Sequence, residues 1–173
     1  QVVLLPILGI NTAIISIIAQ NYGANNVNRI KETYFTAIKY AFIIMITAGT
    51  LVFLSANIIT SFFSSDPEVI EYGKRYLRIS AFVLPAYPVF FLSNGFFMAL
   101  KKSENAMISN FFRNVLNPIV VFYIAKYISA NFDTFFWLWV GINWFFSILY
   151  FLIVIYYFKN KLDKSGAIIH PRP

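Results

Sequence analysis

Long apolar stretches that lack charged side chains constrain this chain more than any other feature of its sequence. The first covers residues 2–19, and about 18 residues are enough for an α-helix to cross the hydrocarbon core of a membrane. Further stretches follow, separated by polar connections. The predicted spans are 2–19, 40–63, 79–100, 106–128 and 134–158, and a basic tail covers 159–173. The sequence therefore predicts an all-α integral membrane protein with five transmembrane helices.

The composition supports a membrane environment. Hydrophobic residues make up 59% of the 173-residue chain and charged residues 12%, which leaves too little polar side chain to cover a surface in water. The net charge of +7 does not indicate nucleic-acid binding, because the Lys and Arg residues are scattered in short groups between apolar runs. With no Cys, and with His170 alone in the tail, the sequence predicts neither an enzyme nor a metal site.

The basic residues in the connections predict how the spans are oriented. One side of the predicted membrane carries the 20–39 connection, the 101–105 turn and the tail, and its cations outnumber those of the other side. They are Arg29, Lys31, Lys39, Lys101, Lys102, Lys159, Lys161, Lys164 and Arg172, against Lys74, Arg75, Arg78 and Lys126. Because Lys and Arg favour cytoplasmic loops, this side and the C-terminus are expected in the cytoplasm. The N-terminus then lies outside, and a further helix is expected upstream.

Prolines in the third and fourth predicted spans are expected to shape their helices. Ser65-Asp66-Pro67-Glu68 has the N-cap residue, proline and acid of a helix start, so a helix is expected to begin there and to continue into the third span. Pro85 and Pro88 lie within the third span and Pro118 within the fourth, where each is expected to kink its helix. Such kinks serve either to fit the helices together or as the hinge of a moving helix.

Arg113 is the cation that falls in the interior of a predicted span, about seven residues from its start. With Asn110, Asn114 and Asn117 it lies at helical spacings of three and four residues, which predicts one polar face. That face either holds helices together through hydrogen bonds or lines a ligand site. For Arg113 itself, the alternatives are a structural cation and a residue of a substrate cavity or gate.

Aromatic residues of the third span give the better candidate for a cavity wall. Tyr87, Phe91 and Asn94 occupy positions i, i+4 and i+7, with Phe90 beside them. Aromatic faces attract ligand cations, with about 0.5–2 kcal/mol for each contact. The alternative is a stripe that packs against another helix or against lipid. Tyr87, Phe91, Asn94 and Asn114 are the predicted substrate-cavity residues.

The first connection contains the most specific sequence motif. It has the sequence Ala19-Gln20-Asn21-Tyr22-Gly23-Ala24-Asn25, followed by Arg29. This stretch resembles the Gln-Asn-x-Gly-Ala signature of the multidrug and toxic compound extrusion (MATE) family, at the cytoplasmic end of the second helix of each lobe. Residues 95–105 and 113–118 resemble two further family motifs. Gln20, Asn21, Gly23, Ala24 and Arg29 are expected to shape the cytoplasmic turn.

The chain departs from this family pattern at several positions. Ala99 and Lys102 replace signature glycines after the third span, and Met98 replaces an arginine of the same motif. One branch of the family has a coupling acid near the position of Tyr87, which cannot carry that charge.

The resemblance implies a twelve-helix secondary antiporter of two six-helix lobes in the plasma (inner) membrane. The five spans would be helices 8–12, most of the C-terminal lobe. Such a protein exports organic cations or drugs in exchange for sodium ions or protons. Because the five predicted spans contain no Asp or Glu, and such acids usually mark coupling sites, the coupling ion is expected to bind in the absent N-terminal lobe. No other cofactor is expected.

Two other functions remain open at this stage. A flippase of lipid-linked saccharides has the same general architecture but usually lines its cavity with Arg and Lys, and only Arg113 lies in the interior of a predicted span. A membrane assembly protein without transport activity is the other. The expected partners are the lipid bilayer, a cationic drug and the missing lobe of the same chain.

Overall fold

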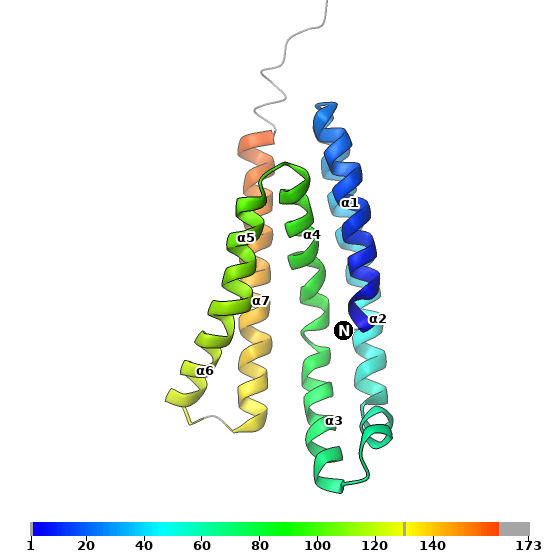
Figure 1. Ribbon diagram of the computed structural model, residues 1–173, viewed down its shortest axis with the longest axis vertical. Helices are drawn as coiled ribbons and strands as arrows, with labels where there is room; N and C mark the ends of the chain where they lie inside the picture. Colours follow the sequence, from blue (N-terminus) through cyan, green and yellow to red (C-terminus); the bar gives the residue numbers. More distant parts are fainter. Residues whose placement is uncertain (1, 130, 163–173) are drawn as a thin grey trace, which may run out of the picture.

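The computed structural model describes residues 2–129 and 131–162, and every described element is helical (Figure 1). The chain begins with a 3-10 turn, η1 (Val2–Leu4), and two long helices, α1 (Leu5–Gly23) and α2 (Val27–Phe63). The next segment contains α3 (Pro67–Ala81), the 3-10 turn η2 (Leu84–Ala86) and α4 (Tyr87–Ala99). After it come α5 (Ser103–Phe111), the π-helix η3 (Phe112–Leu116), α6 (Asn117–Tyr127), α7 (Phe132–Tyr157) and the π-helix η4 (Phe158–Leu162). The all-α prediction is confirmed.

The helices stand side by side around a central column formed by α3 and α4. In the view of Figure 1, α1 and α5–α6 flank this column in front, and α2 and α7 lie behind it. α1 packs against α2 and α4, whereas α7 packs against α3, α4 and α6. The main core fills the space between α1, α2, α4 and α7, where Tyr34, Phe96 and Phe97 are fully buried. The α3–α4 segment therefore packs against α1, α2, α5 and α7.

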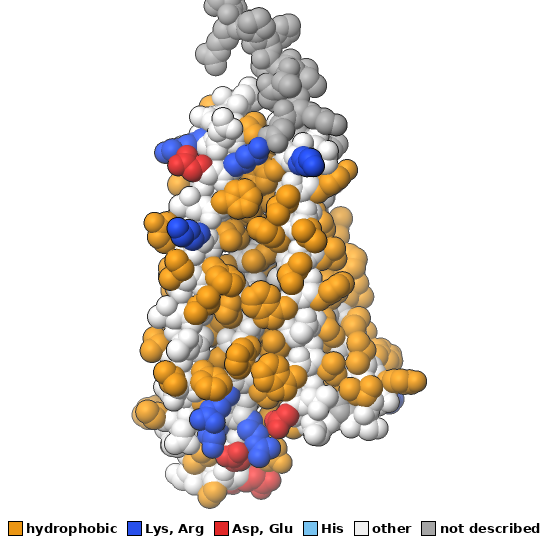
Figure 2. Space-filling view, turned by 180° about the vertical axis from the view of Figure 1, so that it is seen from behind, with side chains coloured by type: hydrophobic (Ala, Val, Ile, Leu, Met, Phe, Trp, Pro, Cys, Tyr) orange, Lys and Arg blue, Asp and Glu red, His pale blue; other side chains and the backbone are white. Residues whose placement is uncertain are grey.

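The surface has the pattern of a membrane protein. In Figure 2, hydrophobic side chains cover the middle of the molecule and charged side chains gather toward its two ends. Four segments of the described chain are long and apolar enough to cross a membrane. They are Val2–Gly23, Val27–Phe63, Pro67–Ala99 and Phe132–Asn160. The fourth predicted span, 106–128, corresponds to α5, η3 and α6, whose Arg113 and amides make it more polar than the others.

The polar connection predicted for residues 20–39 is largely helical, which corrects the expected start of the second span. α2 begins at Val27, and the Asn26 side chain caps it by accepting a hydrogen bond from Arg29 N. Ile30, Tyr34 and Ala37 are buried at positions i, i+4 and i+7. These residues form one apolar stripe, so the helix continues beyond the uncharged stretch as an amphipathic segment.

The predicted helix start before the third span is confirmed, but the segment after it is not one continuous helix. Asp66 caps α3 by accepting a hydrogen bond of 2.8 Å from Glu68 N, and Pro67 occupies the first turn. α-Helical bonding ends at Ala81 and begins again at Tyr87. The tail prediction for 159–173 falls mostly outside the described residues.

Candidate functional site

The interruption between α3 and α4 is the structural centre of the candidate site. Pro85 has no N–H with which to bond the carbonyl of Ala81, and the chain tightens into 3-10 turns. Phe82 N donates to Ile79 O over 3.1 Å, and Ala86 N donates to Val83 O over 3.0 Å. This pattern leaves carbonyls of the interrupted helix to be satisfied by other groups.

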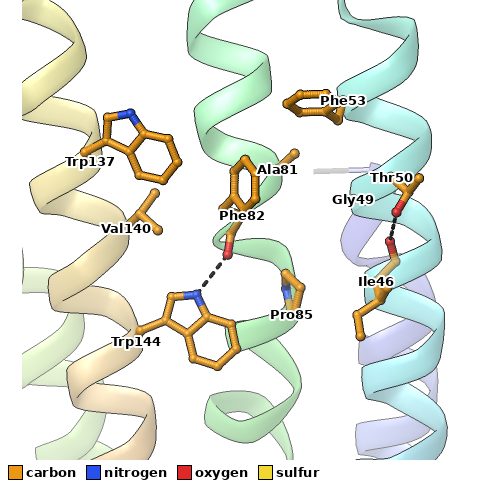
Figure 3. Close-up of a pocket in the computed structure, with 10 residues that line it drawn as sticks. All are labelled: Ile46, Gly49, Thr50, Phe53, Ala81, Phe82, Pro85, Trp137, Val140 and Trp144. Atoms are coloured by element: carbon orange, nitrogen blue, oxygen red, sulfur yellow. Dashed lines mark hydrogen bonds between the residues drawn. The ribbon is translucent and has the colours of Figure 1, made fainter.

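Helices α7 and α2 hold the interruption from two sides (Figure 3). Trp144 Nε1 on α7 donates to Phe82 O over 2.9 Å, and Ser147 Oγ donates to Ala86 O over 3.2 Å. On α2, a methyl group added at Gly49 would lie 3.0 Å from the carbonyl oxygen of Ala81. Glycine thus lets the two backbones approach closely, and the neighbouring helices fix the break in one geometry.

Directly after this break in the chain, three aromatic rings of α4 surround the guanidinium of Arg113. Its Cζ atom lies 4.2 Å from the ring centroid of Phe90, 4.6 Å from that of Tyr87 and 5.2 Å from that of Phe91. Arg113 is partly buried, and none of the ion pairs among the described residues involves it. The predicted aromatic residues therefore meet a cation supplied by the protein itself.

Asn94 and its neighbour Ser93 are buried and bonded to other helices. Asn94 Oδ1 accepts a hydrogen bond of 3.0 Å from the Tyr150 hydroxyl on α7, and Asn94 is only 5% exposed. The hydroxyls of Ser93 and Tyr34 on α2 form a bond of 2.8 Å. These contacts tie α4 to α7 and to α2, and sequence reasoning missed Tyr34, Ser93 and Tyr150. Their signal was weak: Ser93 and Tyr150 carry hydroxyl groups within apolar runs, Tyr34 lies in the predicted polar connection, and none of them indicates its distant partner.

The polar face predicted on the fourth span does not form as expected. The helix widens to a π-helix at Phe112–Leu116, so spacings of three and four residues no longer place side chains on one line. Asn110 and Asn114 are exposed, whereas Asn117 is fully buried with neither of its polar side-chain atoms hydrogen-bonded. Pro118 follows directly in the first turn of α6. The structure thus separates Asn114 from the buried residues of α4.

Arg113 also lines a cleft between α4, α5 and α7. The cleft has a volume of about 420 Å³, and aromatic and aliphatic side chains form most of its walls. Ser109 and Asn105 on α5 and Tyr150 on α7 add polar atoms. This combination of an apolar surface with a few polar groups and one cation is typical of a small-molecule site.

The motif residues form the turn between α1 and α2. Asn26 N donates to Asn21 O over 2.8 Å and Asn25 N donates to Tyr22 O over 3.1 Å, which closes a Schellman motif. Asn25, with φ of 54°, takes the left-handed position, while no described glycine has a positive φ. Gly23 has open space around its Cα, and Arg29 forms an ion pair of 2.9 Å with Glu32. The amides shape this turn, and Gly23 is not needed for its backbone geometry.

The model of the family described as MatE matches residues 1–124, which is more than half of the chain. The chain belongs to the MatE family. This confirms the resemblance drawn from the motifs, and the family is one of membrane transporters rather than of enzymes.

A curated relative and solved structures agree with this membership. The probable multidrug resistance protein YpnP of Bacillus subtilis (strain 168) is 24% identical over 141 residues, which are 82% of this chain and 29% of the relative. A structure described as the inward-facing conformation of a multidrug resistance MATE family transporter matches with a TM-score of 0.89 and 23% identity, covering 95% of this chain and 38% of that one. The outward-facing conformation gives a TM-score of 0.88 and 24% identity, with 95% and 36% covered.

A further solved structure that this chain resembles differs in what its description says of its site. It is a MOP superfamily transporter from Pyrococcus furiosus Vc1, described as having a binding pocket of reverse polarity that suggests a different function. It is 25% identical to this chain, with a TM-score of 0.80, and the match covers 92% of this chain and 37% of that one. The present chain thus spans about a third of the length of the relatives it matches.

Proposed function

We propose that the full-length protein is a secondary antiporter that exports organic cations or drugs across the cell membrane. The observation that carries this proposal is the match of the MatE family model over residues 1–124. The fold supports it, because the chain resembles the inward-facing and outward-facing structures about equally well. A lobe that keeps its own packing in both states is what alternating access by rocking of two lobes requires.

The coupling ion in this proposal is sodium or a proton, and it binds in the N-terminal lobe that the chain lacks. The described apolar spans support this assignment, since the acids of α3 lie near its exposed N-terminal end rather than beside Tyr87 and Arg113. The proposal also requires that the missing lobe of the same chain pack against this one. No group of three or more potential metal ligands occurs in the described part of the chain.

Tyr87 and Phe91 are the proposed cavity residues, with one restriction from the geometry. Because the Arg113 guanidinium lies over both rings, a cationic substrate at this cluster has to use the remaining ring surface or displace the guanidinium. Asn94 faces Tyr150, and we assign it the structural role of holding α4 on α7. Asn114 is exposed on the η3 surface, where the missing lobe or lipid would meet it.

Transport by the full-length protein in sealed liposomes tests this function. When a sodium or proton gradient is imposed, a fluorescent organic cation is expected to cross the membrane in the direction opposite to the flow of that ion. This transport is expected to stop when an ionophore collapses the gradient. Transport independent of both gradients, or an upstream half without an intramembrane Asp or Glu, would contradict antiport.

A pair of substitutions tests the cavity assignment in the same liposomes. Tyr87→Ala is expected to raise the KM for the cation about twofold to thirtyfold, since one aromatic contact contributes about 0.5–2 kcal/mol. Phe62→Ala on α2, an exposed aromatic 84% accessible and far along the chain from the cluster, is the matched control and should leave KM unchanged. Equal kinetics for Tyr87→Ala and the unmodified protein would remove Tyr87 from the cavity.

A further inference from the structure

An apolar groove opens beside the interrupted helix, outside the cluster of Arg113. It lies between α2, the α3–η2 junction and α7, and has a volume of about 540 Å³ (Figure 3). Its walls include Phe53 on α2, Phe82 and Pro85 at the junction, and Trp137 and Trp144 on α7. The volume falls in the range of about 300–1,000 Å³ that is usual for small-molecule sites.

Two of the polar side chains that border this groove, Thr50 and Trp144, are already bonded within the protein. Thr50 Oγ1 donates to Ile46 O over 2.9 Å, and Trp144 Nε1 donates to Phe82 O over 2.9 Å; both bonds are drawn in Figure 3. The Trp137 ring packs against Phe82 with centroids 5.3 Å apart. The groove therefore offers mainly ring faces and methyl groups, and the Trp137 indole N–H is the lining donor for which the described structure has no hydrogen bond. This largely apolar lining suits a hydrocarbon guest.

The side chain of Arg78 provides a positive charge at one end of the groove. Arg78 precedes Ala81 and Phe82 by three and four residues on α3, so it lies on the groove side of that helix, one turn nearer the charged end. Its Cζ atom is 5.4 Å from the ring centroid of Phe53, and the side chain is exposed. The Arg78 charge is thus placed where the groove meets the polar end of the molecule.

The other cations of this helix are neutralised, and Arg78 is not. Lys74 and Arg75 form ion pairs with Glu71 at 2.9 and 3.0 Å, and Arg75 also approaches Asp133 at 3.7 Å. No ion pair among the described residues involves Arg78. Figure 2 shows charged side chains of both signs at the end of the molecule next to the apolar middle band of this face. An anion beside Arg78 would give this cation the ion-pair partner that Lys74 and Arg75 already have.

An apolar groove that ends at an unpaired arginine matches the chemistry of a membrane lipid. We propose that this groove binds one acyl chain of an anionic glycerophospholipid, whose phosphate contacts Arg78. The chain lies along Phe82, Pro85 and Trp144 and covers the interruption between α3 and α4. The site takes its ligand from the bilayer, so this proposal is independent of what the protein transports.

Photo-crosslinking of the full-length protein in phosphatidylcholine nanodiscs tests the proposal. The probes are phosphatidylglycerol and phosphatidylcholine that carry the same photoactivatable acyl chain, and labelled peptides are identified by mass spectrometry. Peptides that contain residues 46–53 and 137–144 are expected to react about fivefold more with the phosphatidylglycerol probe. One cation near the membrane surface favours an anionic lipid by about that factor.

Three variants separate this site from ordinary lipid contact. Arg78→Gln is expected to lower phosphatidylglycerol labelling to the phosphatidylcholine level, while Arg75→Gln, whose guanidinium already faces Glu71 and Asp133, keeps the fivefold ratio. Thr50→Phe fills the groove from an exposed position on α2 and is expected to reduce labelling by both probes.

Several results would overturn the proposal. They are equal labelling by the two probes, equal effects of the two arginine variants, and labelling spread evenly over all exposed helices. Failure of both probes to label the groove would overturn it too, because another segment of the full-length chain would then occupy the groove.

Discussion

Single residues of α4 show how polar groups are used inside this lobe. Asn94 and Ser93 lie within an apolar helix, yet each finds a partner on another helix, Tyr150 and Tyr34 respectively. A buried polar group without a partner is costly in a membrane, so such pairs fix how the helices pack. Asn114 is the same residue type on the η3 surface, but it is exposed and forms no such pair with another helix in the described structure.

The two asparagines give a matched prediction. Asn94→Ala leaves the Tyr150 hydroxyl without its buried acceptor and is expected to lower the free energy of unfolding by about 1–3 kcal/mol. Asn114→Ala is expected to change it by less than about 0.5 kcal/mol. Reversible denaturation of the full-length protein in detergent micelles measures both. A loss of equal size in the two variants would show that the Asn94–Tyr150 bond has no special importance.

Lys101 provides a second prediction at this scale. It ends α4 in a Schellman motif, with Lys102 N donating to Phe97 O over 2.9 Å, and its φ of 57° is left-handed. A residue with a Cβ pays about 1–2 kcal/mol in this conformation. Lys101→Gly is therefore expected to stabilise the protein by about 0.5–1 kcal/mol in the same assay, whereas Lys102→Gly should not. Destabilisation by Lys101→Gly would contradict this account.

At the scale of elements, the interrupted α3–α4 segment depends on its neighbours. The prolines interrupt the α-helical bonding, and α7 supplies donors at the break, from Trp144 to the Phe82 carbonyl and from Ser147 to the Ala86 carbonyl. Farther along, α4 packs so closely on α1 that a methyl group added at Gly95 would lie 2.1 Å from Asn11 Oδ1. The column is thus held by hydrogen bonds at the break and by close packing beyond it.

Removal of the indole donor at the break is expected to be costly. Trp144→Phe leaves the Phe82 carbonyl without its hydrogen bond and should reduce the free energy of unfolding by about 1–3 kcal/mol. Trp137→Phe removes the same indole group from a ring that is 49% exposed and makes only a ring contact with Phe82, so its effect should be smaller. Thermal unfolding in detergent compares the two variants. The reverse order of stability would exclude the proposed role of Trp144.

Close packing of α4 on α1 gives another matched pair. Gly95→Ala introduces a methyl group against Asn11 and is expected to cost about 1–3 kcal/mol through overpacking. Gly141→Ala on α7 has open space around the added methyl group and should be neutral, or stabilising by up to about 1 kcal/mol. Denaturation in micelles distinguishes the two. A neutral Gly95→Ala variant would mean that α1 and α4 lie farther apart in the membrane.

At the scale of the whole molecule, the charged residues divide between the two ends of the bundle. Lys101 and Lys102 lie in the turn after α4, on the same end as the α1–α2 turn, and Lys74 and Arg75 lie at the opposite end. Because Lys and Arg favour the cytoplasmic side, we propose that the α4–α5 turn faces the cytoplasm of a cell whose plasma membrane holds the protein.

Single cysteines test this orientation, since the chain has none of its own. In a full-length protein whose cysteines elsewhere have been replaced, Glu68→Cys at the start of α3 is expected to react with a membrane-impermeant maleimide in intact cells. Ser103→Cys at the start of α5 should react only after the cells are opened. Labelling of Ser103→Cys in intact cells would reverse the proposed topology.

The sequence by itself determined the class of protein and most of its helical segments. Apolar length, helix caps such as Asp66 and the turn signals near Asn25 act over a few residues, so one sequence is enough to predict them. The length of α2 was underestimated because its first turns are amphipathic rather than apolar, and their core contacts are visible only in the fold.

Only the tertiary structure decided what the polar and aromatic residues contact. Trp144 meets Phe82 across 62 residues, Tyr34 meets Ser93 across 59 and Tyr150 meets Asn94 across 56. The Arg113 guanidinium, from the π-helix η3, likewise lies over the rings of Tyr87 and Phe91 on another helix. Pairing at such separations depends on how helices pack against each other. Helical periodicity within one segment does not predict which residues of another segment it will contact.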